Sequence, residues 1–313
     1  MPCEYISYYP AETNLADYII YEFRKDKIIT LLLGKKGVRY AVRGYIMKLS
    51  MITVCYNAEK CIRHTIESVL AQTVPIYEYI IVDGKSEDAT MDIVASYKNE
   101  FKKKDINFKY KSERDKGVSD AFNKGISMVT GDLVGLIHAD DEMMPETNRL
   151  LKKICETLDV DIYYGNCIWI DKKSAANYIL KPKERNVEMM QRLLYEMLLI
   201  HPSTYIKKQS YMKYGGYDIS FKYCMDQEIL YRMYKQGAKF LYIDEVFAKV
   251  TSGGISDTNA RKVFCEASRI PLMNNEPVVK VRLIELKKYV RDRLSRMIKK
   301  IGLYSKRNKF FVD

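Results

Sequence analysis

The sequence has few of the residues that hold transition metals or build disulfide frameworks. Its seven cysteines include no Cys-x-x-Cys pair, and its only histidines are His64, His138 and His201. A zinc site needs clustered Cys and His ligands, and a small secreted domain needs paired cysteines. We therefore exclude both classes and expect reduced thiols.

Long apolar runs are lacking as well. No stretch reaches the roughly 18 apolar residues that a membrane-spanning helix needs. The N-terminus also lacks the cationic, apolar and small-residue zones of a signal peptide. We therefore expect a cytoplasmic protein. With 47% hydrophobic and 29% charged residues over 313 positions, the composition is that of an ordinary globular chain.

The net charge of +12 is confined to the two ends of the chain. Val278–Asp313 holds 12 Lys and Arg against 3 Asp and Glu, and Met1–Lys48 holds 8 against 5. The 229 residues between them carry 32 of each sign. A neutral body argues against a groove that follows a phosphate backbone, so we expect no nucleic-acid partner. The basic tail points to a separate anionic partner.

The chain is interpreted as three segments: an N-terminal extension of unknown role (1–47), an enzyme domain (48–275) and a basic tail (276–313). Within the domain, apolar runs alternate with helical patterns. This alternation predicts an α/β fold, with a mostly parallel central sheet and helices on both faces. The expected strands are 51–55, 79–82, 107–110 and 133–137, and the expected helices are 59–71, 89–97 and 118–129.

Polar residues follow each of these expected strands. They are Tyr56-Asn57, Asp83-Gly84, Glu113–Gly117 and His138–Asp141. In open α/β sheets, ligands bind outside the carboxyl ends of the strands. We therefore expect the four clusters to line one crevice.

Two of these clusters contain carboxylates with expected chemistry. Asp83 ends an apolar strand, where it could accept a hydrogen bond from a uracil imide or simply form a turn or cap. Asp140 and Asp141 follow another apolar strand, and adjacent carboxylates there are costly unless a positive ligand offsets them. Mg²⁺ or Mn²⁺ would do so, with a nucleotide diphosphate completing its ligands. Alternatively, Asp141 caps a helix that begins near Pro145.

A third carboxylate, Asp226, opens an apolar-periodic segment that also contains Glu228. Asp226 could be a helix N-cap. If it faces the crevice, it could instead take a proton from an acceptor hydroxyl as a general base. Candidate acceptor contacts are Glu228, His201 and Trp169. A structural role for His201 and core burial for Trp169 are the alternatives.

In order and spacing, these motifs resemble the family 2 glycosyltransferases with a GT-A fold, specifically the bacterial surface-polysaccharide branch. Each motif alone is weak evidence, but their shared order is specific. The resemblance runs through 50–57, the Asp83 cluster, 112–117, 120–125, 138–141, 201–203, 215–218, 226–228 and 253–256.

The resemblance implies roles in donor binding. Tyr56 and Asp83 match positions that cradle the nucleotide base, and Asn57 belongs to the same site. Asp115 and Asp120 match polar positions that line the donor pocket.

The resemblance also implies the catalytic groups. Asp140 matches the second carboxylate of the family's Asp-x-Asp motif, which holds the metal, with Asp141 beside it. His138 stands where the first carboxylate would be. Asp226 matches the catalytic base. Gly253-Gly254 matches a loop that closes over the diphosphate.

We therefore expect an inverting, metal-dependent glycosyltransferase of the hexosyltransferase class. Its donor would be a nucleotide diphosphate sugar, with UDP-sugar preferred. Its acceptor would be a hydroxyl of a glycan or lipid-linked molecule in O-antigen- or capsule-type polysaccharide synthesis. One alternative is a sugar-phosphate nucleotidylyltransferase, which would want a Gly-rich basic loop where Tyr56–Glu59 stands. The other is a non-catalytic membrane- or nucleic-acid-binding protein on the same scaffold.

Apolar residues in the tail recur every three or four positions, with Lys and Arg on the other faces. This pattern predicts a basic amphipathic helix, suited to the anionic inner face of the cytoplasmic membrane. The alternative is that the apolar stripe packs on the enzyme body. The stripe is Leu283, Leu286, Val290, Leu294, Met297 and Ile301.

Overall fold

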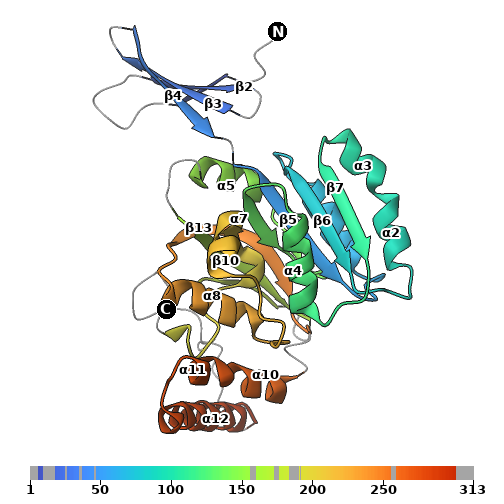
Figure 1. The fold of residues 1–313 in the computed structure, drawn as a ribbon, viewed down its shortest axis with the longest axis vertical. Coiled ribbons are helices and arrows are strands. Elements are labelled where there is room, and N and C mark those ends of the chain that lie inside the picture. The colour runs from blue at the N-terminus through green and yellow to red at the C-terminus, as the bar shows by residue number, and fades with distance from the viewer. Residues whose placement is uncertain are drawn as a thin grey trace.

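The structure is a computed structural model with two separate β-sheets and a long C-terminal helix (Figure 1). Its side chains are described only from Met47 onward. It describes residues 6–9, 18–24, 27–34, 37–45, 47–155, 160–172, 176–182, 190, 192–254 and 259–300.

The N-terminal extension contains a four-stranded antiparallel sheet. Its strands lie in sequence order: β1 (Ile6–Tyr9), β2 (Tyr18–Arg24), β3 (Lys27–Gly34) and β4 (Gly37–Tyr45). The hairpin between β3 and β4 closes where Gly34 faces Gly37. This sheet is not among the elements expected from the sequence, although an apolar run that ends in closely spaced glycines is a hairpin signal.

The first half of the main sheet is parallel and has the order β7-β6-β5-β8. Every strand and helix expected in this half is confirmed, with ends that differ by a few residues. The strands are β5 (Leu49–Cys55), β6 (Glu78–Asp83), β7 (Asn107–Ser112) and β8 (Leu133–Leu136), and the helices are α1 (Ile62–Leu70), α2 (Thr90–Ser96), α3 (Lys98–Lys103) and α4 (Val118–Met128).

Beyond β8 the sheet is mixed. The α/β class is confirmed, but the whole sheet is not mostly parallel, because β12 is antiparallel to both β8 and β10. These two reversals leave β10 and its parallel neighbour β13 pointing the same way as β8. Strand β9 pairs with β13 and β11 with β10, both antiparallel. The strands are β9 (Glu142–Met143), β10 (Ile162–Asp171), β11 (Ala176–Leu180), β12 (Thr204–Lys207) and β13 (Phe240–Thr251).

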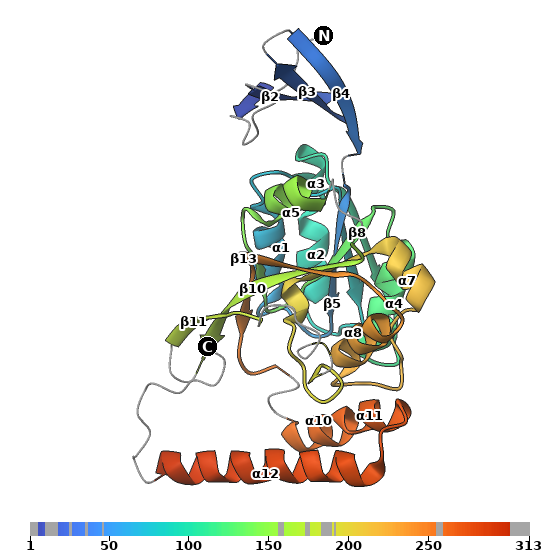
Figure 2. The same cartoon turned by 90° about the vertical axis from the view of Figure 1, so that its left-hand side faces the viewer.

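Helices cover both faces of the main sheet, with α1 and α2 on one side of β5 and α4, α7 and α8 on the other (Figure 2). Strands β5 and β6 are buried along their whole length, which explains their unbroken apolar sequence. Their side chains alternate between two cores, so that Ile52 and Met51 point to opposite faces. The remaining helices are α5 (Thr147–Cys155), the 3-10 turn η1 (His201–Ser203), α7 (Lys208–Tyr214), α8 (Met225–Lys235), α10 (Ala260–Ala267) and α11 (Arg269–Met273).

The expected basic amphipathic helix is present as α12 (Val278–Lys300). It packs on the body through Val281, which is 2% exposed, and through the half-buried Ile284 and Lys288. The apolar stripe expected from the sequence faces the other way. Its members Leu283, Leu286, Val290 and Leu294 are each 45% to 57% exposed.

Packing of that stripe against the body, the alternative considered from the sequence, is therefore not what the structure shows. Met297 and Ile301, the last two residues of the expected stripe, lie outside the described side chains. Among the described helices, none is both long and apolar enough to cross a bilayer.

A buried carboxylate fastens the amino end of the main sheet. Glu78, the first residue of β6, forms an ion pair with Lys109 Nζ at 2.5 Å. Ser50 Oγ donates to it at 2.8 Å, and the Thr130 N–H and hydroxyl donate at 2.9 and 2.7 Å. Burial disfavours the charged form, but these four donors outweigh that effect and lower the pKa of Glu78. The carboxylate thus joins β5, β6 and β7 to the chain before β8.

We expect Glu78→Ala to lower the free energy of unfolding by about 2–4 kcal/mol, because it leaves several buried donors without an acceptor. The matched control is Lys103→Ala, which breaks only an exposed ion pair with Glu100 and should cost less than about 1 kcal/mol. Because the folded pKa of Glu78 lies below its unfolded value, its contribution should disappear as the pH falls below about 4. Urea unfolding measures both variants, and equal losses would contradict this role.

Candidate active site

The carboxyl ends of the strands meet at one edge of the main sheet, as the sequence predicted. Cys55 at the end of β5 is level with Asp83 on β6, and Asp83 is level with Ser112 on β7. His138 follows β8 at the same edge, because Leu136 pairs with Ile52. Strands β10 and β13 run the same way, so Lys172 and Ser252 also follow strand ends on this side.

Tyr56 and Asn57 form the first loop of this edge. The Tyr56 side chain is 61% exposed, which leaves its ring open to stack on a nucleotide base. Asn57 has a left-handed backbone, with φ of 49°, and ties its loop to the next one. Its N–H donates to Ser86 Oγ at 2.8 Å, and its side-chain oxygen accepts from the Glu87 N–H at 2.9 Å.

Asp83 uses its carboxylate within the protein. One oxygen accepts from Ser86 Oγ at 2.5 Å, and the other accepts from the Ser86 N–H at 2.9 Å and from Ser112 Oγ at 2.6 Å. The residue has no exposed surface. This geometry matches the turn-forming alternative, and a direct contact between Asp83 and a nucleotide base stays a prediction.

Asp115 and Asp120 both shape the loop that leads into α4. Asp115 accepts from the Gly117 N–H at 2.8 Å and lies against Gly84, where an added Cβ would come within 2.7 Å of its Oδ2. Gly84 thus makes room for Asp115 beside Tyr56. Asp120 accepts from the Lys116 N–H at 3.0 Å and pairs with Lys124 at 3.3 Å. These contacts, the Lys116 N–H first, lower the pKa of Asp120 despite its partial burial.

The adjacent carboxylates after β8 have different environments. Asp140 is exposed, whereas Asp141 is 3% exposed and accepts from the Thr251 N–H of β13 at 3.3 Å. Burial first, and then the charge of Asp140, raise the pKa of Asp141 to about 8. Asp141 does not cap α5, because that helix begins only at Thr147. Asp140 is therefore the carboxylate that faces the crevice.

The donor set at this edge fits a hard cation that takes most of its ligands from the substrate. Among the described residues, no group of three His, Cys, Asp or Glu side chains is placed to hold a metal ion. Mg²⁺ is commonly bound by one or two carboxylates together with water and substrate phosphates. The exposed Asp140 can provide that single carboxylate, and the buried Asp141 is less suited to do so.

Lys172, at the end of β10, is a site residue that the sequence analysis missed. Burial and Asp140 raise the pKa of the Cys61 thiol, and the Lys172 charge opposes them, as it does at Asp141. Its backbone N–H donates to Ser252 Oγ at 2.9 Å, and an added Cβ at Gly253 would lie 3.9 Å from its side chain. Lys172 therefore brings a positive charge to the carboxylates and the glycine loop.

The glycine loop itself follows β13. Gly253 has φ of 106°, a conformation that L-residues with side chains rarely adopt, and a side chain added at Gly254 would meet open space. Ile255 and Ser256, the rest of this motif, lie outside the described residues. Closure of the loop over a diphosphate stays a prediction.

Asp226 lies in the first turn of α8, but it is not the N-cap. That position belongs to Cys224, whose side chain makes no capping hydrogen bond. The Asp226 carboxylate accepts from the Gln227 N–H at 2.8 Å. Burial first, and then the nearby charge of Glu266, raise the pKa of Asp226 to about 6. A carboxyl group with such a pKa is ionised at neutral pH and is a stronger base than an exposed one.

Glu266, on α10, holds the loop that precedes α8. Its carboxylate accepts from three consecutive backbone N–H groups, those of Lys222, Tyr223 and Cys224, at 2.8, 2.6 and 2.7 Å. These bonds fix the turn from which Asp226 projects. No local pattern in the sequence gives Glu266 this role, because its partners lie more than 40 residues away.

A stack of rings connects the two halves of the site. His201 Nε2 lies 2.8 Å from the Tyr217 hydroxyl, and the ring of His201 is 5.8 Å from that of His138. Burial, and then His138, lower the pKa of His201 to about 3, so both partners of this hydrogen bond are neutral. His201 is thus a satisfied structural histidine.

This stack ends near a carboxylate on each side. His138 lies two residues before Asp140, and the charge of Asp226 acts on Tyr217, whose pKa is raised well above its usual value mainly by burial. The stack therefore bridges Asp140 and Asp226.

Two further candidates have structural contacts. Glu228 is buried and forms an ion pair with Arg232 at 2.7 Å, and Arg232 NH2 also donates to the Gly216 carbonyl oxygen at 2.6 Å. Trp169 is half-buried on β10, level with Tyr178 of β11 and Val250 of β13, so full core burial is not observed. Acceptor contacts by these residues stay predictions.

The mixed α/β sheet, with its polar carboxyl edge, defines a GT-A type fold. Residues 50–215 match the sequence model described as glycosyl transferase family 2, which is more than half of the chain. An uncharacterised glycosyltransferase of Rickettsia prowazekii is 31% identical over 224 residues, covering 69% of this chain and 67% of that protein. The chain therefore belongs to glycosyl transferase family 2.

Other relatives are more distant. A PGL/p-HBAD biosynthesis glycosyltransferase of Mycobacterium bovis is 25% identical over 71% of this chain and 84% of its own length. TarS 1-349 of S. aureus, solved in complex with UDP-GlcNAc, superposes with a TM-score of 0.56 at 18% identity, covering 72% of this chain and 66% of that chain. A longer TarS chain is covered to only 40%.

A third fold relative is a mannosyltransferase of Pyrobaculum calidifontis in complex with GDP-Man and Mn²⁺. Its TM-score is 0.55 at 16% identity, over 73% of this chain and 65% of that chain. At such identities the structural likeness shows the fold alone.

Proposed function

We propose that this chain transfers a sugar from a UDP-sugar to an acceptor hydroxyl with inversion at the anomeric carbon. The observation that supports this most is that one ring stack bridges an exposed carboxylate, Asp140, and a carboxylate with a raised pKa, Asp226. Family membership favours sugar transfer over the nucleotidylyl transfer considered from the sequence.

In the proposed reaction, Asp226 accepts the proton of the acceptor hydroxyl while that oxygen attacks the anomeric carbon. The bond between this carbon and the diphosphate breaks, and the diphosphate leaves with the electron pair. No covalent enzyme intermediate forms, so the configuration inverts. Asp140 would hold Mn²⁺ or Mg²⁺, which supplies positive charge for the leaving diphosphate. Lys172 adds a second positive charge beside the same group.

The proposed donor rests on the first loops of the edge. Tyr56 offers an exposed ring for a base, and Asn57 and Asp115 shape the floor beside it. One fold relative binds UDP-GlcNAc and another binds GDP-Man with Mn²⁺. We place a uridine nucleotide first, because the sequence resemblance puts Asp83 where it could meet a uracil imide.

A panel of sugar nucleotides, with and without Mn²⁺, tests donor and metal together by thermal stabilisation. A ligand at about 100 times its Kd stabilises the folded state by about 2.7 kcal/mol, so we expect a rise in Tm of several degrees with one UDP-sugar and Mn²⁺. Asp140→Ala should abolish the Mn²⁺-dependent part, and the exposed-site control Asp92→Ala should keep it. A panel without any shift, or a full shift in Asp140→Ala, would overturn this part.

The role of Asp226 is tested by turnover, measured as UDP release from the donor found in that panel. Asp226→Asn should lower turnover by about 10²- to 10⁴-fold and leave donor binding unchanged. With the native residue, turnover should rise with pH to a plateau above about 6, because the raised pKa keeps the base protonated below that value. The matched control is Asp244→Asn, an exposed residue of β13. Near-normal turnover in Asp226→Asn would show that another group is the base.

The proposed acceptor is a glycan or a lipid-linked molecule used in surface-polysaccharide synthesis. The mycobacterial relative is named for glycolipid-related biosynthesis. The structure supports a membrane-side acceptor through α12, whose outward stripe is flanked by exposed cations such as Arg282, Lys287, Arg291 and Arg293. Apolar side chains between cations suit an anionic bilayer surface. We therefore place the protein on the inner face of the cytoplasmic membrane.

Vesicle binding tests this placement. The protein should bind vesicles that contain anionic lipid, less at high salt, and replacing Leu283, Leu286 and Val290 by Ser should weaken binding at least about tenfold. The control replaces three exposed apolar residues outside α12, Ile179, Met212 and Ile219, by Ser. If both triple variants bind equally well, α12 is not the membrane contact.

A further inference from the structure

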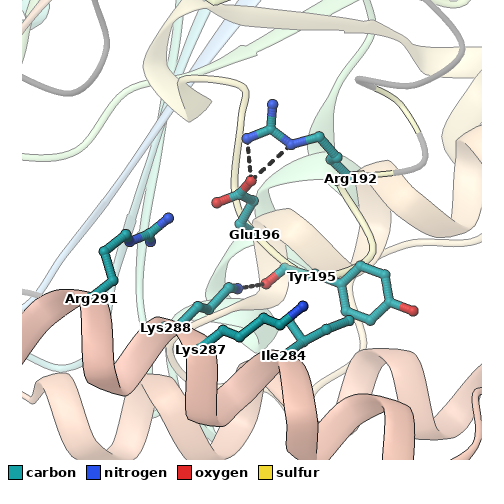
Figure 3. A pocket seen from close by; sticks show the side chains of 7 residues that line it. All are labelled: Arg192, Tyr195, Glu196, Ile284, Lys287, Lys288 and Arg291. Atoms are coloured by element: carbon teal, nitrogen blue, oxygen red, sulfur yellow. Dashed lines mark hydrogen bonds and ion pairs between the residues drawn. The ribbon is translucent and has the colours of Figure 1, made fainter.

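A pocket of about 290 Å³ lies between α12 and the segment 192–196 (Figure 3). Four of its lining side chains are cationic, and only one, that of Glu196, is acidic. Three of the cations come from α12 and one from the segment opposite. They are Arg192, Lys287, Lys288 and Arg291.

The charges of this pocket are not balanced within it. Glu196 is engaged by Arg192, whose Nε donates to it at 3.0 Å, and Lys288 donates to the Tyr195 carbonyl oxygen. Lys287 and Arg291 form no ion pair with any described side chain, and both extend from α12 at the pocket (Figure 3). The pocket therefore has a net positive charge and suits an anion that can accept several hydrogen bonds.

The two sides of the pocket face different parts of the molecule. Lys287 and Arg291 are four positions apart and so lie on one face of α12, between the packed Ile284 and Lys288 and the outward stripe at Leu283 and Val290. Since the stripe is the proposed membrane contact, one side of the pocket borders the membrane surface.

The other side borders the start of α8. Leu193, which lies next to the pocket residue Arg192, accepts a hydrogen bond at 3.0 Å from the side chain of Gln227. Gln227 is the neighbour of Asp226, the proposed base. The pocket thus lies between the proposed membrane face and the helix that presents the base.

We propose that this pocket binds a phosphate group of the lipid to which the acceptor sugar is attached. The inference rests on the proposed function, because it assumes a lipid-linked acceptor at the membrane. Guanidinium and ammonium groups that converge on one space are the usual partners of phosphate oxygens. A phosphate anchored there holds the lipid at the surface while the sugar beyond it reaches toward Asp226.

Binding to inorganic pyrophosphate and to vesicles tests the pocket in the full-length protein. Calorimetry with pyrophosphate is done in EDTA, so that metal-dependent binding in the donor site does not contribute. Vesicles of phosphatidylcholine contain either phosphatidic acid, with a terminal phosphate, or phosphatidylglycerol, at matched surface charge. Lys287→Ala/Arg291→Ala should weaken pyrophosphate binding about tenfold or more and remove a preference for phosphatidic acid.

The matched control is Arg282→Ala/Arg293→Ala, which removes the same charge from the other flank of the stripe. It should lower vesicle binding in general but leave pyrophosphate binding and the preference for phosphatidic acid unchanged. Equal losses in both double variants would overturn the proposal, since the helix would then act only as a basic face. Pyrophosphate binding without any preference for phosphatidic acid would assign the pocket to a soluble phosphate and overturn the lipid assignment.

The donor shift with Mn²⁺ separates this test from the proposed function. Both double variants should keep that shift, because neither touches the carboxyl edge of the sheet. A native protein that shows no donor shift would refute the proposed function, whereas an intact shift with failed phosphate binding would refute only the pocket.

Discussion

The direction of the strands in the main sheet decides where the reactive groups lie. Strands β5, β6 and β8 are parallel, and the single reversed strand β12 returns the chain so that β10 and β13 point the same way. Their loops therefore open on one edge. Exposed Tyr56 and Asp140, cationic Lys172 and the Gly253-Gly254 turn meet there, although more than 190 residues separate the first from the last. Without this common edge, none of these residues would form a site.

Burial then gives chemically similar residues different roles. Asp140 stays in solvent, where a cation can reach it, whereas burial raises the pKa of its neighbour Asp141 to about 8. Asp226 falls between these extremes, with a pKa of about 6 that suits a base at neutral pH. His201 remains neutral and structural, because burial lowers its pKa to about 3. Environment, rather than residue type, separates the proposed base from the structural groups around it.

The sequence predicts best what local patterns encode. The strands and helices of the parallel half are apolar runs and helical periods, and all of them are present. The mixed half and the N-terminal sheet depend on pairings between distant segments, which no local window contains. The same limit hides Lys172 and Glu266, whose partners are far along the chain. The tail was predicted as a helix, but only packing through Val281 and Ile284 determines that its apolar stripe faces outward.

The central claim is that a nucleotide sugar binds across this carboxyl edge, between Tyr56 and Asp226. A crystal structure of the protein with a UDP-sugar and Mn²⁺ tests it most directly. The account predicts the base against Tyr56, the diphosphate and Mn²⁺ at Asp140 near Lys172, and the anomeric carbon turned toward Asp226. A nucleotide bound elsewhere, or an anomeric carbon turned away from Asp226 with the acceptor side closed, would contradict it.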